Sequence, residues 1–282
     1  MNDVETKLAI VQMNSTEHAK DNLAKAEAFV TEAATKHDGK IIVVPEFFNI
    51  PYVFQYRDYA HIDRAETADG PSITLMRKLA KQHKAAIVAT IFEEEAAGLY
   101  YDTAYFIEAG GEIVGKYRKT HPAAVQSLEK IYFRYGSHFP VFKLQGIKVG
   151  AVICYDTLFP ETARCVALNG AELIVVPFAA PVLPAWRSIM VCRAFENGAW
   201  FAPTNKVGPE GEWVFGGSSM IVDPTGTVAT EFSATEEGVK STLISRKAVY
   251  DARRIKPMFR DRRPDLYTPI STQTEDIASF VA

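Results

Sequence analysis

A cysteine follows directly on an apolar segment near the middle of the chain. Residues 147–153 form an apolar run of the kind found in buried strands, and the run stops at Cys154. A proline and a helical pattern follow from Pro160. A cysteine at the carboxyl end of a buried strand lies at the rim of a sheet, where it can act as a nucleophile. The alternative is an inert buried thiol, which is the commoner role of an intracellular cysteine.

Two charged residues also come directly after predicted strands. Glu46 follows the apolar run at residues 41–45, where burial would raise the pKa of its carboxyl group and suit it to general-base catalysis. Lys119 follows a predicted hairpin, where an ammonium group can lower the pKa of a nearby thiol or stabilise an oxyanion. Each position, taken alone, is more typical of a solvated loop residue.

Hydrophobic periodicity predicts the elements that must position these three residues. Continuous apolar runs predict buried strands, and apolar residues spaced three or four apart predict amphipathic helices. Strands are expected at 7–13, 40–45, 85–92, 141–144, 147–153, 173–177, 200–204, 218–222 and 226–230, a hairpin at 100–117, and helices at 21–37, 72–84, 161–169 and 186–198. Residues 118–136 are expected to be irregular. Strands with helical crossovers, mixed with hairpins, predict an α/β fold with helices outside.

The chain has no linker-like break in its composition. Residues 1–282 are therefore predicted to form a single domain. From about residue 250 the sequence is rich in Arg and Pro, and its periodicity is weak. We expect this part to form a carboxyl-terminal arm, which either packs on a second subunit or is solvated.

The three positions and their neighbours resemble the nitrilase (carbon–nitrogen hydrolase) superfamily. The similarity rests on residues 44–47 (VPEF), 117–121 (YRKTH), 149–156 (VGAVICYD) and 159–161 (FPE), and it extends from the first strand to about residue 230. The resemblance implies a four-layer α-β-β-α sandwich and assembly into a homodimer or larger homo-oligomer. It also implies a Glu-Lys-Cys triad that needs no metal and no organic cofactor.

The resemblance also implies a role for each residue. Glu46 takes the proton of Cys154, and the thiolate attacks the carbonyl carbon of an amide or ureido group. Lys119 and the backbone N–H of Tyr155 stabilise the oxyanion. The nitrogen leaves as ammonia or an amine, and water then hydrolyses the thioester.

A further motif points to a branch of the superfamily. Residues 129–136 (EKIYFRYG) are similar to the amidase and N-carbamoyl-amine branches, where the glutamate is a second catalytic carboxylate in the pocket. Glu129 is assigned this role. The alternative is that Glu129 and Lys130 belong to a charged pair on the surface of a helix. Cys154-Tyr155-Asp156 differs from the Cys-Trp-Glu typical of nitrilases proper, which argues against nitrile substrates.

The segments 197–200 and 205–208 are similar to N-carbamoyl-D-amino-acid amidohydrolases. In that group, arginines after the cysteine clamp the substrate carboxylate, whereas this chain has Thr157 and Leu158 there. A carboxylate would then need another cation, such as Arg187. The expected substrate is therefore a small amide or N-carbamoyl compound whose side chain is left open.

Other residues are candidates for the substrate-binding wall. Tyr52 lies shortly after Glu46, although core packing is an alternative for this aromatic ring. The predicted substrate-binding residues are Tyr52, Tyr155, Phe178, Ala179 and Trp186. His121 is expected to orient its loop, and Cys165 and Cys192 are expected to be structural because they fall inside helical patterns.

Composition excludes several classes of partner. The net charge of −3 gives no electrostatic case for nucleic acid or an anionic membrane surface. The three cysteines have no Cys/His spacing typical of zinc sites, so free thiols in a reducing compartment are expected. The chain shows neither a signal-peptide pattern nor an apolar run of the roughly 20 residues that span a bilayer. A soluble cytoplasmic protein is predicted.

The predicted function is hydrolysis of a non-peptide C–N bond in a small amide or N-carbamoyl compound. An ω-amidase-type substrate is the second choice within this class. A soluble acyltransferase on the same scaffold would pass the acyl group to another acceptor. A non-catalytic interaction module is the third alternative, and the intact Glu, Lys and Cys argue against it.

Overall fold

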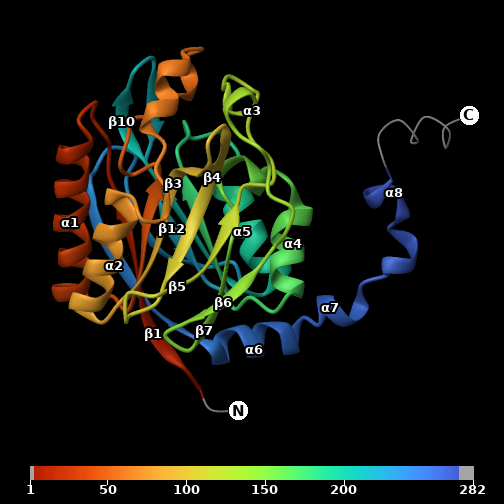
Figure 1. The fold of residues 1–282 in the computed structure, drawn as a ribbon. Coiled ribbons are helices and arrows are strands. Elements are labelled where there is room, and N and C mark those ends of the chain that lie inside the picture. The colour runs from red at the N-terminus through yellow and green to blue at the C-terminus, as the bar shows by residue number, and fades with distance from the viewer. Residues whose placement is uncertain (1–2, 273–282) are drawn as a thin grey trace, which may run out of the picture.

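The computed structural model describes residues 3–272 and contains two six-stranded sheets that pack face to face (Figure 1). The first sheet has the strand order β14-β1-β2-β3-β4-β5, and the second has the order β13-β12-β9-β8-β7-β6. In each sheet three neighbouring strands are parallel, β1 with β2 and β3, and β7 with β8 and β9. The other strands pair antiparallel.

The strands of the two sheets have the following bounds. The first sheet contains β1 (Glu5–Gln12), β2 (Ile41–Glu46), β3 (Ala86–Ala96), β4 (Leu99–Ile107), β5 (Ile113–Arg118) and β14 (Gly238–Ser245). The second contains β6 (Val141–Leu144), β7 (Ile147–Ala151), β8 (Leu173–Phe178), β9 (Trp200–Asn205), β12 (Met220–Val222) and β13 (Val228–Glu231). A separate two-stranded hairpin is formed by β10 (Val207–Glu210) and β11 (Trp213–Gly216).

Helices cover the outer face of each sheet (Figure 1). On one side lie α1 (Ala19–Thr35) and α2 (Pro71–His83), and on the other α4 (Pro160–Leu168) and α5 (Trp186–Asn197). Short helical turns lie in the connections, namely η1 (Val53–Gln55), η2 (Tyr59–Arg64), α3 (Glu129–Tyr132) and η3 (Cys154–Leu158). The predicted four-layer α-β-β-α sandwich is confirmed.

Alternation along β1 shows why the central strands read as continuous apolar runs. Leu8 and Ile10 lie in the core between the two sheets, whereas Ala9 and Val11 pack in the core under α1 and α2. Both faces of the strand are therefore buried, as in the parallel sheets of α/β proteins. The carboxyl ends of these strands place Glu46 and the cysteine turn at the same end of the sandwich.

Three features differ from the sequence-based expectations. Strand β7 ends at Ala151 instead of residue 153, and Cys154 begins the helical turn η3. The hairpin β10–β11 and the edge strand β14 were not anticipated. Only one other strand pairs with β14, and most of its residues are partly exposed, so its apolar alternation is weak.

The last described elements extend along and away from the sandwich (Figure 1). Helix α6 (Arg246–Ile255) packs on the body through the buried Val249, and Arg253 donates hydrogen bonds to two backbone carbonyls. Beyond it lie α7 (Met258–Asp261), η4 (Pro264–Leu266) and α8 (Thr268–Ser271). The single domain and the arm's contact with a second subunit remain predictions, and residues 273–282 of the arm lie outside the described part. Within residues 3–272 there is no helix that combines the length and the apolar character needed to cross a bilayer.

Candidate active site

The buried ammonium group of Lys119 contacts two other predicted catalytic residues and one further carboxylate. Lys119 Nζ lies 2.8 Å from Glu46 Oε1 and 3.0 and 2.8 Å from the two carboxylate oxygens of Glu129. It also lies 3.2 Å from Oδ2 of Asp102, a residue on β4 that was not predicted to belong to the site. All four side chains are at most 1% exposed. The fold thus brings Glu46 to Lys119 and Glu129, which follow it by more than 70 residues.

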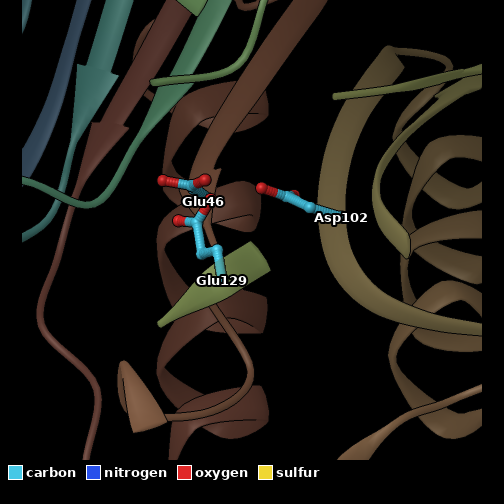
Figure 2. Close-up of side chains that lie close together, drawn as sticks. All are labelled: Glu46, Asp102 and Glu129. Carbon is cyan, nitrogen blue, oxygen red and sulfur yellow. The ribbon is translucent and has the colours of Figure 1, made fainter. Parts of the chain in front are cut away.

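The three carboxylates point toward one another from separate elements (Figure 2). One oxygen from each of Glu46, Asp102 and Glu129 lies within 4.8 Å of the others, a spacing that suits a bound cation. The Lys119 ammonium lies within ion-pairing distance of all three carboxylates and supplies that positive charge. We therefore assign no metal ion to this cluster.

Burial controls the protonation of this cluster. It raises the pKa of Glu46, with the charge of Lys119 opposing, and it raises the pKa of Asp102 well above the usual range. Burial alone would lower the pKa of Lys119, but the carboxylates of Glu129 and Glu46 outweigh it and raise that pKa. Among the described residues, Glu46 Oε2 and both Asp102 oxygens have no hydrogen-bond partner. Glu46 therefore has the raised proton affinity that a general base needs.

The cysteine occupies a strained turn. Cys154 has a φ of +45°, in the left-handed region that a residue with a side chain rarely adopts. The Thr157 hydroxyl donates to the Cys154 carbonyl, and the Ile153 N–H donates to Asp156 Oδ2 at 2.9 Å. These contacts hold the turn in the strained conformation that faces the thiol toward a cavity.

Asp156 ties the cysteine turn to the lysine loop. Its Oδ2 accepts from the Tyr117 hydroxyl at 2.6 Å, and its Oδ1 accepts from the Thr120 hydroxyl at 2.8 Å and the His121 N–H at 2.9 Å. Burial would raise the pKa of Asp156, but hydrogen bonds from His121 and Tyr117 lower it, so the carboxylate is charged. Because these partners flank Lys119, Asp156 fixes the lysine relative to the thiol. The His121 ring contacts Asp156 as well, which agrees with the loop-orienting role expected for it.

The Cys154 thiol is protonated at rest. Burial raises its pKa well above the usual range, and the charge of Glu46 adds to the shift, while Lys119 and the Ala179 N–H oppose it. Formation of the thiolate consequently requires a base beside it.

A cavity of about 170 Å³ opens in front of Cys154. All five predicted substrate-binding residues line it, namely Tyr52, Tyr155, Phe178, Ala179 and Trp186. The Tyr52 hydroxyl donates to Glu129 Oε1 at 2.6 Å, which connects the cavity wall to the buried cluster. The remaining lining residues are Ala123, Val125, Gln126, Ser127, Leu158, Ala180, Pro181, Leu183, Ile189, Met190 and Trp213.

Sequence reasoning missed part of this wall. Trp213 stacks on Tyr52 with ring centroids 5.0 Å apart, but it lies on the unpredicted strand β11. The suggested cation Arg187 does not line the cavity, and its exposed side chain pairs with Glu231. All three cysteines are free, and Cys165 and Cys192 lie outside the lining.

Known proteins resemble this chain over most of its length. Residues 7–254 match the family model described as carbon–nitrogen hydrolase. A citrullinase from Francisella tularensis subsp. tularensis is 34% identical over 280 residues, covering 94% of this chain and 97% of the relative. An N-carbamoylputrescine amidase from Solanum lycopersicum is 33% identical over 285 residues and covers 94% of each chain.

A solved structure has the same fold. A carbon–nitrogen hydrolase from Helicobacter pylori G27 superposes with a TM-score of 0.90 at 28% identity, covering 95% of this chain and 99% of that one. The resemblance predicted from the four motifs is thereby confirmed. The chain belongs to the carbon–nitrogen hydrolase family of the nitrilase superfamily, and the protein is a carbon–nitrogen hydrolase.

Proposed function

We propose that this enzyme hydrolyses a small amide or N-carbamoyl compound through a covalent thioester on Cys154. One observation carries the proposal. The strained cysteine turn faces a cavity, and Asp156 ties it to the loop whose Lys119 contacts Glu46 and Glu129. A nucleophile, a base and an oxyanion-stabilising cation are thus held on one rigid framework.

The acylation step uses the base and the cation together. Glu46 takes the thiol proton, and the Cys154 sulfur forms a bond to the substrate carbonyl carbon. The carbonyl oxygen becomes an oxyanion, which Lys119 and the backbone N–H of Tyr155 stabilise. When the oxyanion collapses, the C–N bond breaks, and the nitrogen takes the proton from Glu46 and leaves as ammonia or an amine.

In deacylation, water takes the place of the thiol as the group that Glu46 deprotonates. Glu46 takes a proton from water, the resulting hydroxide attacks the thioester carbon, and the C–S bond breaks. An amide yields a carboxylic acid, and an N-carbamoyl compound yields a carbamate that decomposes to carbon dioxide and an amine or ammonia. The thiolate recovers its proton from Glu46, which restores the resting enzyme.

Glu129 supports this chemistry from behind the cavity wall. It accepts hydrogen bonds from Lys119, from the Tyr52 hydroxyl and from the Ala123 N–H at 2.7 Å. These contacts connect the catalytic cation to the wall that faces the substrate. We propose that Glu129 fixes the positions of the Lys119 ammonium group and the Tyr52 hydroxyl. Through these two groups it orients the substrate or the attacking water.

Two further proposals concern the enzyme's setting. The three free cysteines favour a reducing cytoplasm, because Cys154 must stay a thiol for catalysis. Exposed apolar side chains such as Leu266 and Ile270 near the carboxyl end favour a homo-oligomer.

Ammonia release tests the function. The purified enzyme and a Cys154→Ala variant would be incubated with a panel of amides and ureido compounds, with and without an added amine or hydroxylamine. Release in water alone, abolished in the variant, supports hydrolysis. Release only with the added nucleophile supports the acyltransferase alternative instead. The panel includes an ω-amidase-type substrate, and the rate of ammonia release decides between it and the other amides and ureido compounds.

A further inference from the structure

The cavity in front of Cys154 has no charged lining. None of the described residues that line it is an Asp, Glu, Lys, Arg or His. Most of the lining is apolar, with side chains from several segments, among them Val125, Leu158, Leu183, Ile189 and Met190, of which the first three are partly exposed to solvent. A substrate group in this space therefore meets hydrocarbon on most sides.

Several basic side chains on the surrounding elements have other partners. On α5, Arg187 pairs with Glu231, and Arg193 bonds the Thr157 carbonyl at 3.1 Å and Glu196 at 3.0 Å. The buried Lys206 near the hairpin β10–β11 is held at 2.7 Å by Glu210. His121 stacks on Phe159 with ring centroids 4.0 Å apart and contacts Asp156. Lys119 lies within ion-pairing distance of three carboxylates, and the proposed function uses it for the carbonyl oxygen of the substrate and not for the side group.

The polar side chains of the lining are neutral, and two of them are already used. The hydroxyls of Tyr52 and Ser127 lie 2.8 Å apart, and Tyr52 also bonds Glu129. Gln126 and Tyr155 remain as uncharged polar groups in the lining. Nothing in this set of described residues can balance a full charge on the substrate.

We propose that the substrate carries an uncharged, apolar side group: a neutral alkyl or aryl amide, or the corresponding N-carbamoyl (ureido) compound. This inference rests on the proposed function, because the carbonyl carbon must lie at Cys154 while the side group fills the cavity. A carboxylate or ammonium group there would lose its hydration without gaining a partner. Each methylene, in contrast, gains from leaving water, by about fourfold in binding.

Two matched series test the proposal. The amides are pentanamide, 5-aminopentanamide and the monoamide of glutaric acid, which have the same chain length and differ in terminal charge. The ureas are butylurea, 4-aminobutylurea and 4-ureidobutanoate. We expect kcat/KM for ammonia release from each neutral member to exceed that of its charged partners by about 100-fold or more, the size expected for an unpaired charge.

A charge placed at the cavity supplies the matching gain-of-function test. Leu158 is 38% exposed, so the Leu158→Arg guanidinium can reach both solvent and the cavity. We expect this variant to raise kcat/KM for the glutaric monoamide, relative to pentanamide, by about tenfold or more. Leu168→Arg is the matched control, since Leu168 is 43% exposed and lines a different hollow, and the ratio should stay unchanged.

Failure of this inference and failure of the proposed function give different results. Ammonia release that is as fast or faster from the charged members overturns the inference and leaves the hydrolase standing. No release from any member overturns the proposed function, and alkylation of Cys154 then decides the inference. N-butyl iodoacetamide should label Cys154 at least about tenfold faster than N-(3-carboxypropyl) iodoacetamide, and equal rates would contradict a charge-free cavity.

Discussion

Replacing Lys119 with methionine removes the single ammonium group that lies among three buried carboxylates. The substitution keeps an unbranched chain but leaves Glu46, Asp102 and Glu129 without their cation, and all are at most 1% exposed. Loss of one partner from a buried ion pair costs about 3–5 kcal/mol. In a protein of this size, that loss corresponds to a fall in Tm on the order of 10 °C.

The loss of stability should depend on pH in a defined direction. The pKa values of Glu46 and Asp102 are already above their ordinary values of 4.5 and 3.8 because of burial, and Lys119 opposes both shifts. Without Lys119 they rise further, so the folded variant binds protons more tightly than its unfolded chain. Such groups stabilise the fold below their unfolded pKa, and this stability is lost as pH rises through the folded pKa. The deficit relative to the parent should therefore be larger at pH 8 than at pH 5.

Differential scanning calorimetry at pH 5 and pH 8, with ammonia release assayed in parallel, measures both effects. We expect kcat/KM to fall by about a hundredfold or more, because the oxyanion loses its cation. Lys143→Met, at an exposed position on β6, is the matched control and should leave both readouts unchanged. A Tm of Lys119→Met within about 2 °C of the parent's Tm would refute the assignment of Lys119 as the balancing charge. A loss of stability that does not depend on pH would refute it as well.

Three further predictions concern the same cluster. Glu129→Gln should lower kcat/KM by roughly ten- to a hundredfold by loosening Lys119, as steady-state kinetics would show. Asp102→Asn should stabilise the fold by about 1–2 kcal/mol at pH 8, and less at pH 5, since burial raises the pKa of Asp102; urea unfolding at both pH values measures this. The acid limb of the kcat/KM profile should lie above pH 4.5, because burial raises the pKa of the base Glu46, and Glu46→Gln should cost at least about a hundredfold in rate.

The central strands and the residues that end them could be predicted from the sequence. A strand buried on both faces, such as β2 or β8, reads as a continuous apolar run that surface segments do not imitate. Glu46 is conspicuous because it directly follows such a run, and Cys154 follows another. Glu46 ends β2 of the first sheet and Cys154 follows β7 of the second, so their proximity depends on the face-to-face packing of the two sheets, which no local pattern predicts.

Other parts of the site carry no local signal. Asp102 lies inside β4, where the buried part of the strand begins, and only the pairing of β4 with β5 brings it to Lys119. Trp213 reaches Tyr52 through a hairpin whose strands are only four residues each. The strained backbone at Cys154 could not be predicted either, because its left-handed φ is held by the surrounding hydrogen bonds and no glycine marks the position.

Peptide mass spectrometry of the enzyme quenched during turnover tests the covalent route most directly. The enzyme would be mixed with pentanamide, quenched in acid and digested, alongside Cys154→Ala and Cys192→Ser variants. We expect a pentanoyl group on the peptide that contains Cys154, both in the parent enzyme and in the Cys192→Ser control. Full turnover with no acyl group at Cys154, or with Cys154 replaced by alanine, would contradict a thioester mechanism in this hydrolase.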